Sequence, residues 1–284
     1  MSTPFTKLRP SCHGFGLAAY LVTAALPLGC TSTAAIAADL PVKSEKAAAY
    51  QWSGCYFGLN GGIDGPGVTF ATAVNPVGTH LPTPADALEV SHDGSGAANT
   101  TSWVAGGQVG CNWQSATLVL GLEGDFDYLG GVPQFTNDTN LLPSTGDPFV
   151  IKQSLQTDYL GTVRARVGVA ADRNLGYLTG GVAFTQTHYT QSYVDSLFGG
   201  ALPGAGVATA SKSLIGWVAG AGWEHASTDN WIFRVEYLFT KFGATDASGA
   251  ITDAARGVNA FQGAANDLVV QILRVGVNYK FSMP

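Results

Sequence analysis

The C-terminal segment 273–281 alternates strictly between apolar and polar residues. Its apolar or aromatic positions are Leu273, Val275, Val277, Tyr279 and Phe281, and the positions between them are Arg274, Gly276, Asn278 and Lys280. A strand places successive side chains on opposite faces, so this pattern predicts a strand with one apolar and one polar face. No helical pattern follows that could cover the apolar face. What the chain can fold into therefore depends on the solvent that this face meets.

Seven earlier segments have comparable strand patterns, and the connections between the segments alternate in length. The eight strands are predicted at 51–62, 101–113, 117–129, 155–170, 174–190, 211–226, 230–243 and 267–281. Three connections are tight turns, "QSAT", "ADRN" and "ASTDN". The other connections, 63–100, 130–154, 191–210 and 244–266, are long and rich in Gly, Pro, Asn, Asp, Ser and Thr.

Short turns at one rim and long loops at the other are typical of transmembrane barrels, and a soluble sandwich has no reason to sort its loops in this way. Backbone groups cannot face lipid unpaired, so a spanning sheet must close, and eight strands allow closure. The predicted fold is all-β: an eight-stranded antiparallel up-and-down transmembrane β-barrel over residues 51–284. Its apolar face would then meet acyl chains.

Composition and charge agree with this fold. The 284 residues include 37 glycines and are only 12% charged, which suits many short strands and turns better than a soluble enzyme. The net charge of −6 argues against a nucleic-acid partner. After residue 38 no apolar run is long enough for a transmembrane helix.

The N-terminus has the pattern of a secretory signal peptide, predicted at residues 1–37. Lys7 and Arg9 precede the apolar run 17–28, and "AIA" at 35–37 is a cleavage site. A membrane anchor is disfavoured because the run is short and contains Pro27, which also argues against a lipoprotein site at Cys30. Residues 38–50 would form a periplasmic N-terminal segment, and the exported barrel would reside in the cell outer membrane.

Two cysteines, Cys55 and Cys111, remain after the signal peptide and would occupy an oxidising compartment. Antiparallel pairing of the first two strands places them roughly opposite each other, near the end where the short turns lie. We therefore predict a disulfide between them. The alternative is two unrelated small residues facing lipid.

Charged residues share one parity within their strands, which predicts a network inside the barrel. Glu123 and Asp125 on one strand should meet Arg164 and Arg166 on the next. In the same way, Arg234 and Glu236 should meet Arg274. Asp127 shares a face with Glu123 and Asp125, and three carboxylates could instead bind Ca²⁺ or serve as an acid/base pair.

Aromatic residues near the strand ends predict girdles at the two membrane surfaces. Trp52, Trp113, Trp231, Tyr279 and Phe281 lie towards the short turns or the termini, and Trp103, Tyr128, Tyr159 and Tyr237 lie towards the long loops or the middle.

Catalytic and cofactor motifs are absent from the sequence: there is no G-x-S-x-G, H-E-x-x-H, P-loop or C-x-x-C. No cofactor is expected. The five histidines show no metal-ligand spacing. His188 lies near the long-loop rim, where barrel enzymes use a histidine with a serine or an acid, but the sequence identifies no partner for it. We therefore expect no enzymatic activity.

Several segments together resemble the small outer-membrane immunogenic (porin-family) barrels of alphaproteobacteria. These segments are "WSGCYFGLNGG" (52–62), "GGQVGCNWQ" (106–114), "GLEGDFDY" (121–128), "LGTVRARVGVA" (160–170), "YLTGGVAF" (177–184), "GWVAGAGWEHA" (216–226), "NWIFRVEYLF" (230–239) and "RVGVNYKF" (274–281), with "AADLP" at 37–41. The resemblance covers all eight predicted strands in order. In one departure, Ser282, Met283 and Pro284 follow Phe281, whereas such barrels usually end on the aromatic residue.

The resemblance implies a surface antigen with a structural role in the envelope and a role in surface interactions. An eight-stranded barrel has an interior filled by side chains, so a wide pore is excluded. The alternatives are a narrow porin-like channel for small solutes and a barrel enzyme. The expected partners are outer-membrane lipids, the barrel insertion machinery acting on the C-terminal strand, and host or envelope molecules at the long loops.

Overall fold

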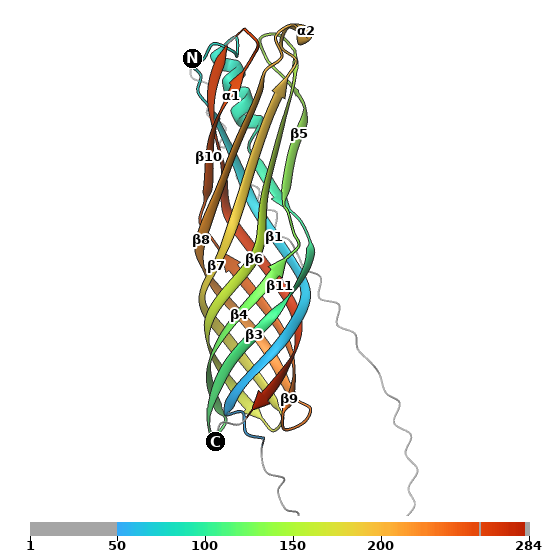
Figure 1. Ribbon diagram of the computed structural model, residues 1–284, viewed down its shortest axis with the longest axis vertical. Coiled ribbons are helices and arrows are strands. Elements are labelled where there is room, and N and C mark those ends of the chain that lie inside the picture. The colour runs from blue at the N-terminus through green and yellow to red at the C-terminus, as the bar shows by residue number, and fades with distance from the viewer. Residues whose placement is uncertain (1–49, 256, 282–284) are drawn as a thin grey trace, which may run out of the picture. The chain divides into compact units, whose positions relative to one another are not determined.

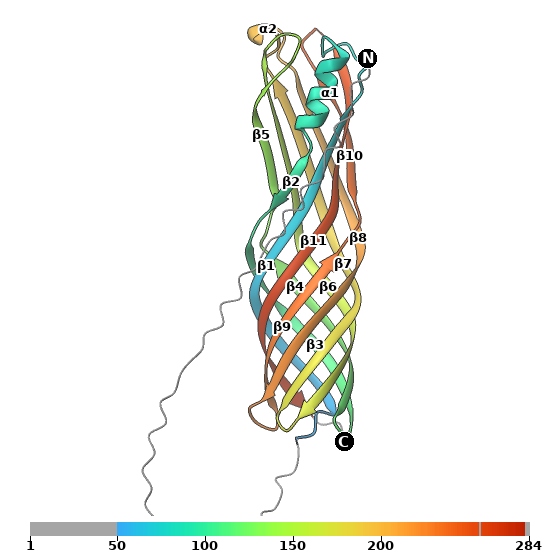
Figure 2. The same cartoon turned by 180° about the vertical axis from the view of Figure 1, so that it is seen from behind.

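The computed structural model describes residues 50–255 and 257–281, which form an antiparallel β-barrel (Figures 1 and 2). Eight strands close into a ring in the order β1, β3, β4, β6, β7, β8, β9 and β11, and β11 pairs with β1 to complete it. The predicted fold class is confirmed. The expected signal peptide, most of the segment 38–50 and the extension Ser282–Met283–Pro284 lie outside the described residues.

The ring strands are β1 (Gly54–Val74), β3 (Ser102–Ser115), β4 (Leu118–Leu129), β6 (Pro148–Ala171), β7 (Asn174–Asp195), β8 (Ala205–Ala226), β9 (Trp231–Lys241) and β11 (Val258–Phe281). Three further strands are β2 (Gly96–Asn99), β5 (Gln134–Leu141) and β10 (Thr245–Thr252), and the helices are α1 (Pro84–Asp93) and α2 (Leu197–Gly200). Neither helix is long and apolar enough to cross a membrane.

The short connections are the tight turns that the sequence predicts. Only residues 116–117 link β3 to β4, and only residues 172–173 link β6 to β7. Ala116 and Asp172 have positive φ angles of 54° and 51°, as the first residues of two-residue hairpin turns often do. We call this rim the short-turn end of the barrel, and the opposite rim the long-loop end.

The long connections differ from the prediction, because much of the chain that was expected to be loop is strand. β1, β6, β7, β8 and β11 are 21 to 24 residues long and continue well past the predicted boundaries. β2, β5 and β10 add to the sheet there, pairing with β1, β6 and β11. In these strand extensions and added strands, small and polar residues replace large apolar ones on one face. The alternation that marks a strand is therefore weak in their sequence.

The wall towards the short-turn end exposes apolar side chains on its outer face, as a lipid-facing surface requires. On β1 the exposed positions include Phe57, Leu59 and Ile63, while Tyr56, Asn60 and Asp64 point inward and are buried. Across the barrel the band continues with Leu120, Leu122, Phe126, Val163, Val167, Leu178, Val182, Phe233, Val235, Leu273 and Val275. This band identifies the membrane-spanning part of the barrel.

Further along the same strands the pattern inverts. Beyond Ile63 the outward positions of β1 are small or polar, whereas the inward positions include Val68, Phe70 and Val74, which join a large apolar core. The parity of the inward residues does not change along β1. A strand with a polar outer face and an apolar inner face is typical of a structure in water, so this part of the barrel projects beyond the lipid.

Aromatic side chains lie near both edges of the apolar band. Trp231 and Tyr279 pack edge-to-face at 5.2 Å towards the short-turn end, and Trp103 and Tyr128 stack at 5.4 Å towards the long-loop end. Trp52 differs from the prediction. Its side chain is fully buried at the short-turn mouth of the lumen, where it packs against Tyr50 at 4.9 Å between ring centroids.

Helix α1 lies at the long-loop end beside β1 (Figure 2). Thr83 and Asp86 form a capping box at its N-terminus, with Pro84 at the first helical position. Ala87 and Val90 are buried in the apolar core of this end. The long-loop end is thus packed as a small globular unit on top of the membrane-spanning wall.

Candidate functional site

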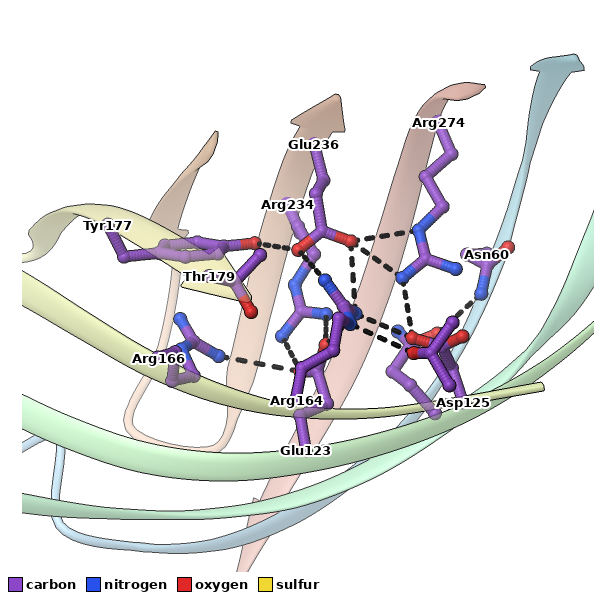
Figure 3. Close-up of polar contacts among 12 residues, drawn as sticks. Asn60, Glu123, Asp125, Arg164, Arg166, Tyr177, Thr179, Arg234, Glu236 and Arg274 are labelled. Carbon is purple, nitrogen blue, oxygen red and sulfur yellow. Dashed lines mark hydrogen bonds and ion pairs between the residues drawn. The ribbon is translucent and has the colours of Figure 1, made fainter. Parts of the chain in front are cut away.

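The strongest concentration of polar chemistry is a cluster of buried charged side chains inside the membrane-spanning part of the barrel (Figure 3). Every member occupies an inward position, which follows from the period of two along each strand. The members are Glu123, Asp125 and Asp127 on β4, Arg164 and Arg166 on β6, Glu224 on β8, Arg234 and Glu236 on β9, and Arg274 on β11. We call this set the lumen charge cluster.

Glu123 lies at the centre of the cluster. Its carboxylate is 2.5 Å from the Arg164 guanidinium, 2.5 Å from that of Arg234 and 3.5 Å from that of Arg166. The Tyr56 hydroxyl on β1 also donates a hydrogen bond to it. Four donors from three other strands therefore surround one buried carboxylate, the condition under which a buried charge is tolerated.

A second group of contacts surrounds Arg274 and Arg164. Arg274 is 2.6 Å from Glu236 and 3.0 Å from Asp125, and it also contacts Asp127. Arg164 reaches Asp125 at 2.5 Å and Glu236 at 3.0 Å. These contacts join strands β4, β6, β9 and β11 across the lumen.

Glu224 completes the cluster towards the short-turn end. It lies 2.8 Å from Arg166 and 2.7 Å from Arg234. The Arg166 guanidinium lies over the ring of Tyr177, 3.9 Å from its centroid, and the Tyr177 hydroxyl donates to Glu236 at 2.8 Å. Aromatic and charged groups therefore fill this layer of the lumen together.

The structure brings together most of the residues that the sequence singled out, with one rearrangement. Arg164 pairs directly with Glu123 in the β4–β6 register, and Arg274 pairs with Glu236 in the β9–β11 register. Arg234 shares no carboxylate with Arg274: its carboxylate contacts are Glu123 and Glu224, whereas those of Arg274 are Asp125, Asp127 and Glu236.

Three participants were missed by sequence reasoning. Glu224 lies in "GWEHA", where nothing in the sequence links it to a charge elsewhere. Tyr56 and Tyr177 have strand parities that put them inside, but a tyrosine in a strand is too common to signal a role. Asp125 and Asp127, which with Glu123 could have formed a cation site, instead contact arginines.

The disulfide prediction is confirmed: Cys55 and Cys111 are bonded. They are direct neighbours in the β1–β3 register, with Cα atoms 3.9 Å apart. The bond lies near the short-turn end, where Cys55 also neighbours Phe281 across the β1–β11 pairing that closes the barrel.

His188 has neighbours that the sequence could not identify. Its Nδ1 is 2.7 Å from the Ser211 hydroxyl, and its Nε2 is 3.7 Å from Asp158. Asp158 is on β6 and Ser211 on β8, the two strands that pair with β7 on either side of His188, and the imidazole is 42% exposed. His188 pairs with Gln156 and Ser211 in these ladders, and β6 has a bulge between Thr157 and Leu160 beside them.

Among the residues that the structure describes, one group of side chains could hold a metal ion on geometry alone. Glu89, His92 and Asp93 on α1 place a ligand atom each within 4.8 Å of one another. The sequence pattern gave no reason to expect it because the helix itself was not predicted. His92 is 83% exposed and already hydrogen-bonds Asp93, so the group has the character of a solvated helix face.

Comparison with known proteins identifies the family. A family model for the outer membrane protein beta-barrel domain matches residues 22–281. The 25 kDa outer-membrane immunogenic protein of Brucella abortus is 29% identical over 92% of this chain and 96% of its own length. The 31 kDa outer-membrane immunogenic protein of Brucella melitensis is 30% identical over 88% of this chain and 95% of its own.

Among solved structures, this chain is similar to Ail of Yersinia pestis, with 13% identity and a TM-score of 0.34 over 81% of this chain and 99% of that one. It is also similar to OprG of Pseudomonas aeruginosa, with 11% identity and a TM-score of 0.38 over 82% and 99%. The family match includes all of the described residues, and the relatives are named as outer-membrane proteins. This chain accordingly belongs to the outer membrane protein beta-barrel domain family of the bacterial outer membrane.

Proposed function

We propose that this protein is a surface-exposed envelope protein whose barrel anchors a folded long-loop end for interactions outside the cell, and that it does not conduct solutes. The observation that carries the proposal is the filling of the barrel interior. Three layers follow one another: Tyr50 and Trp52 at the short-turn mouth, the lumen charge cluster, and the apolar core of the long-loop end.

The proposed orientation puts the short turns and both termini in the periplasm and the long-loop end outside. The inverted pattern beyond Ile63 supports an aqueous location for the long-loop end. A rigid, folded projection is suited to contact with large partners. Host or envelope molecules at this end, outer-membrane lipids around the apolar band, and the insertion machinery acting on β11 are the partners that we propose.

Protease treatment of intact cells tests the orientation. We expect external cleavage only in connections of the long-loop end, within 75–83, 142–147, 196–204 or 253–257. Cleavage at the short turns 171–174 or 226–230 would reverse the proposed orientation.

Conductance of the purified protein in planar bilayers tests the absence of a pore. We expect no discrete openings from the wild type or from a Tyr50→Ala, Trp52→Ala double variant, because the charge cluster and the apolar core would still fill the lumen. Regular single-channel steps in the wild type would favour the alternative, a narrow channel for small solutes. Steps only in the double variant would identify the short-turn mouth as the sole barrier.

A further inference from the structure

His80, in the connection between β1 and α1, is buried between two carboxylates at the long-loop end. Its Nε2 is 2.7 Å from Asp195 Oδ2, and its Nδ1 is 2.7 Å from Asp253 Oδ2. The side chains of His80 and Asp195 are fully buried, and that of Asp253 is nearly so. Asp195 ends β7 and Asp253 follows β10, so one imidazole connects three separate segments.

The geometry favours a charged ring between two carboxylates. A neutral imidazole carries one N–H and one lone pair, and it can donate to only one of the two carboxylates. The other carboxylate would then face a lone pair at 2.7 Å in a buried site, which is unfavourable for both groups. The imidazolium ion donates to both at once.

The two carboxylates in turn organise the backbone around them. Asp195 Oδ1 accepts from the backbone N–H groups of Leu197 (3.1 Å) and Gly204 (2.8 Å). Asp253 Oδ1 accepts from the Gly257 N–H at 2.8 Å. Loss of the histidine contacts would therefore loosen α2 and the β10–β11 connection together.

Other titratable groups lie on the elements around this site. The Tyr193 hydroxyl on β7 donates to Asp195 Oδ2 at 2.9 Å. Asp86 on α1 acts electrostatically on Tyr193, and Asp147 accepts from the backbone of α2. Asn259 on β11 is neutral and accepts from the His80 backbone N–H at 2.9 Å.

Protons can reach this site from solvent. Burial by itself lowers the pKa of His80, but the hydrogen bonds and charges of Asp195 and Asp253 outweigh it and raise the pKa above the ordinary histidine value. His80 and Asp253 also line a surface cavity of about 460 Å³, together with Thr79, Leu197 and Phe198. The ring is therefore close to water although its own atoms are covered.

We propose that His80 is a proton-controlled latch of the long-loop end. Protonated His80 holds the segments 75–83, 195–204 and 253–255 together, and loss of the proton releases them. The pKa of His80 is raised while the ring contacts the two carboxylates. The contacts are therefore fully formed below the ordinary histidine pKa, and they are lost as pH rises through the raised value. This surface of the protein is thus more rigid in acid than in alkali.

The full-length protein in detergent micelles or liposomes allows two direct measurements. Nitrogen NMR of histidine-labelled protein should show both His80 nitrogens protonated at about pH 5.5, with the proton lost towards about pH 9. The rate of proteinase K cleavage within 253–258 should be measured for the wild type and for His80→Gln at each pH. The ratio of the two rates does not depend on how the activity of the protease itself changes with pH. We expect the variant to be cleaved about tenfold faster at about pH 5.5 and equally fast at about pH 9.

Two further variants keep the test decisive. His92→Gln removes an exposed histidine at the same end and should behave as the wild type. Asp253→Asn removes one of the two carboxylates and should move the opening to lower pH by about 1–2 units. A neutral His80 at about pH 5.5, or a cleavage ratio between His80→Gln and wild type that does not change with pH, would overturn the latch.

Discussion

Arg234 on β9 and Glu123 on β4 lie 2.5 Å apart, although their strands are four positions apart in the eight-strand ring in either direction. The side chains therefore meet across the full width of the lumen. Contacts of this kind connect opposite walls, whereas the backbone ladders connect only neighbouring strands. The lumen charge cluster thus acts as an internal brace for the membrane-spanning part of the barrel.

Removing Glu123 should destabilise the barrel strongly. In Glu123→Ala, the guanidinium groups of Arg164 and Arg234 lose their shared carboxylate inside the lumen, and breaking a buried pair costs about 3–5 kcal/mol. Asp138→Ala is the matched control, because this acidic residue is exposed on β5. The midpoint of guanidinium unfolding in detergent should fall much further for Glu123→Ala. Equal shifts would mean that the cluster is in contact with bulk water.

Reduction of the disulfide should weaken the barrel without unfolding it. The bond closes a loop with a sequence separation of 56, for which a stabilisation of about 2–4 kcal/mol is typical. The Cys55→Ala, Cys111→Ala double variant should still show heat-modifiable migration on gels, because the backbone ladders of the ring remain, but at a lower transition temperature. Mass spectrometry of non-reduced wild type should find the two cysteine peptides joined; quantitative alkylation of both thiols would contradict the bond.

Two adjacent glycines of β3 should respond differently to a methyl group. A Cβ at Gly106 would point into the lumen and overlap Asp127 Oδ1 and the Phe126 carbonyl, whereas a Cβ at Gly107 would face outward with the Gly58 carbonyl oxygen at 3.4 Å as its nearest neighbour. Gly106→Ala should cost about 1–3 kcal/mol through overpacking. Gly107→Ala should change the unfolding midpoint little, and a larger effect at Gly107 would reverse the assignment of inner and outer faces.

Helix α1 should loosen in acid, in contrast to the latch. Burial raises the pKa of Asp86, but hydrogen bonds from Ser144 and Thr83 outweigh this and lower it below the usual range. A lowered pKa means that Asp86 stabilises the fold above the ordinary aspartate pKa and that this contribution is lost as pH falls through the lowered value.

Hydrogen exchange of residues 84–93, compared between wild type and Asp86→Asn, measures this effect. At neutral pH the variant should exchange faster, because Asn cannot accept the same set of hydrogen bonds, and the difference should shrink in strong acid. Asp93→Asn, on the same helix, is the control and should change the exchange of these residues little at neutral pH. A difference that stays constant down to strong acid would show that the Asp86 charge does not hold the helix.

The sequence alone determined the local features of the barrel. Alternation with a period of two depends only on strand geometry, so it separated the two faces of each strand and placed Glu123, Arg164, Arg234 and Arg274 on the charged faces. The three short turns, and the parity and order of the first two strands, were enough to pair Cys55 with Cys111. These features depend on the chain within one strand, on one tight turn, or on the order of two successive strands.

The tertiary structure alone decided which side chains meet across the lumen. The contact of Arg234 with Glu123, and the inclusion of Glu224 and Tyr56, depend on the tilt and stagger of all eight strands, which no local pattern specifies. The same holds for His80 and its two carboxylates, which lie 115 and 173 residues away along the chain. The sequence did not predict that the long-loop end is folded, because alternation does not tell which face of a strand points into the barrel. That choice depends on the surrounding solvent, which changes from lipid to water along β1 while the inward parity stays the same.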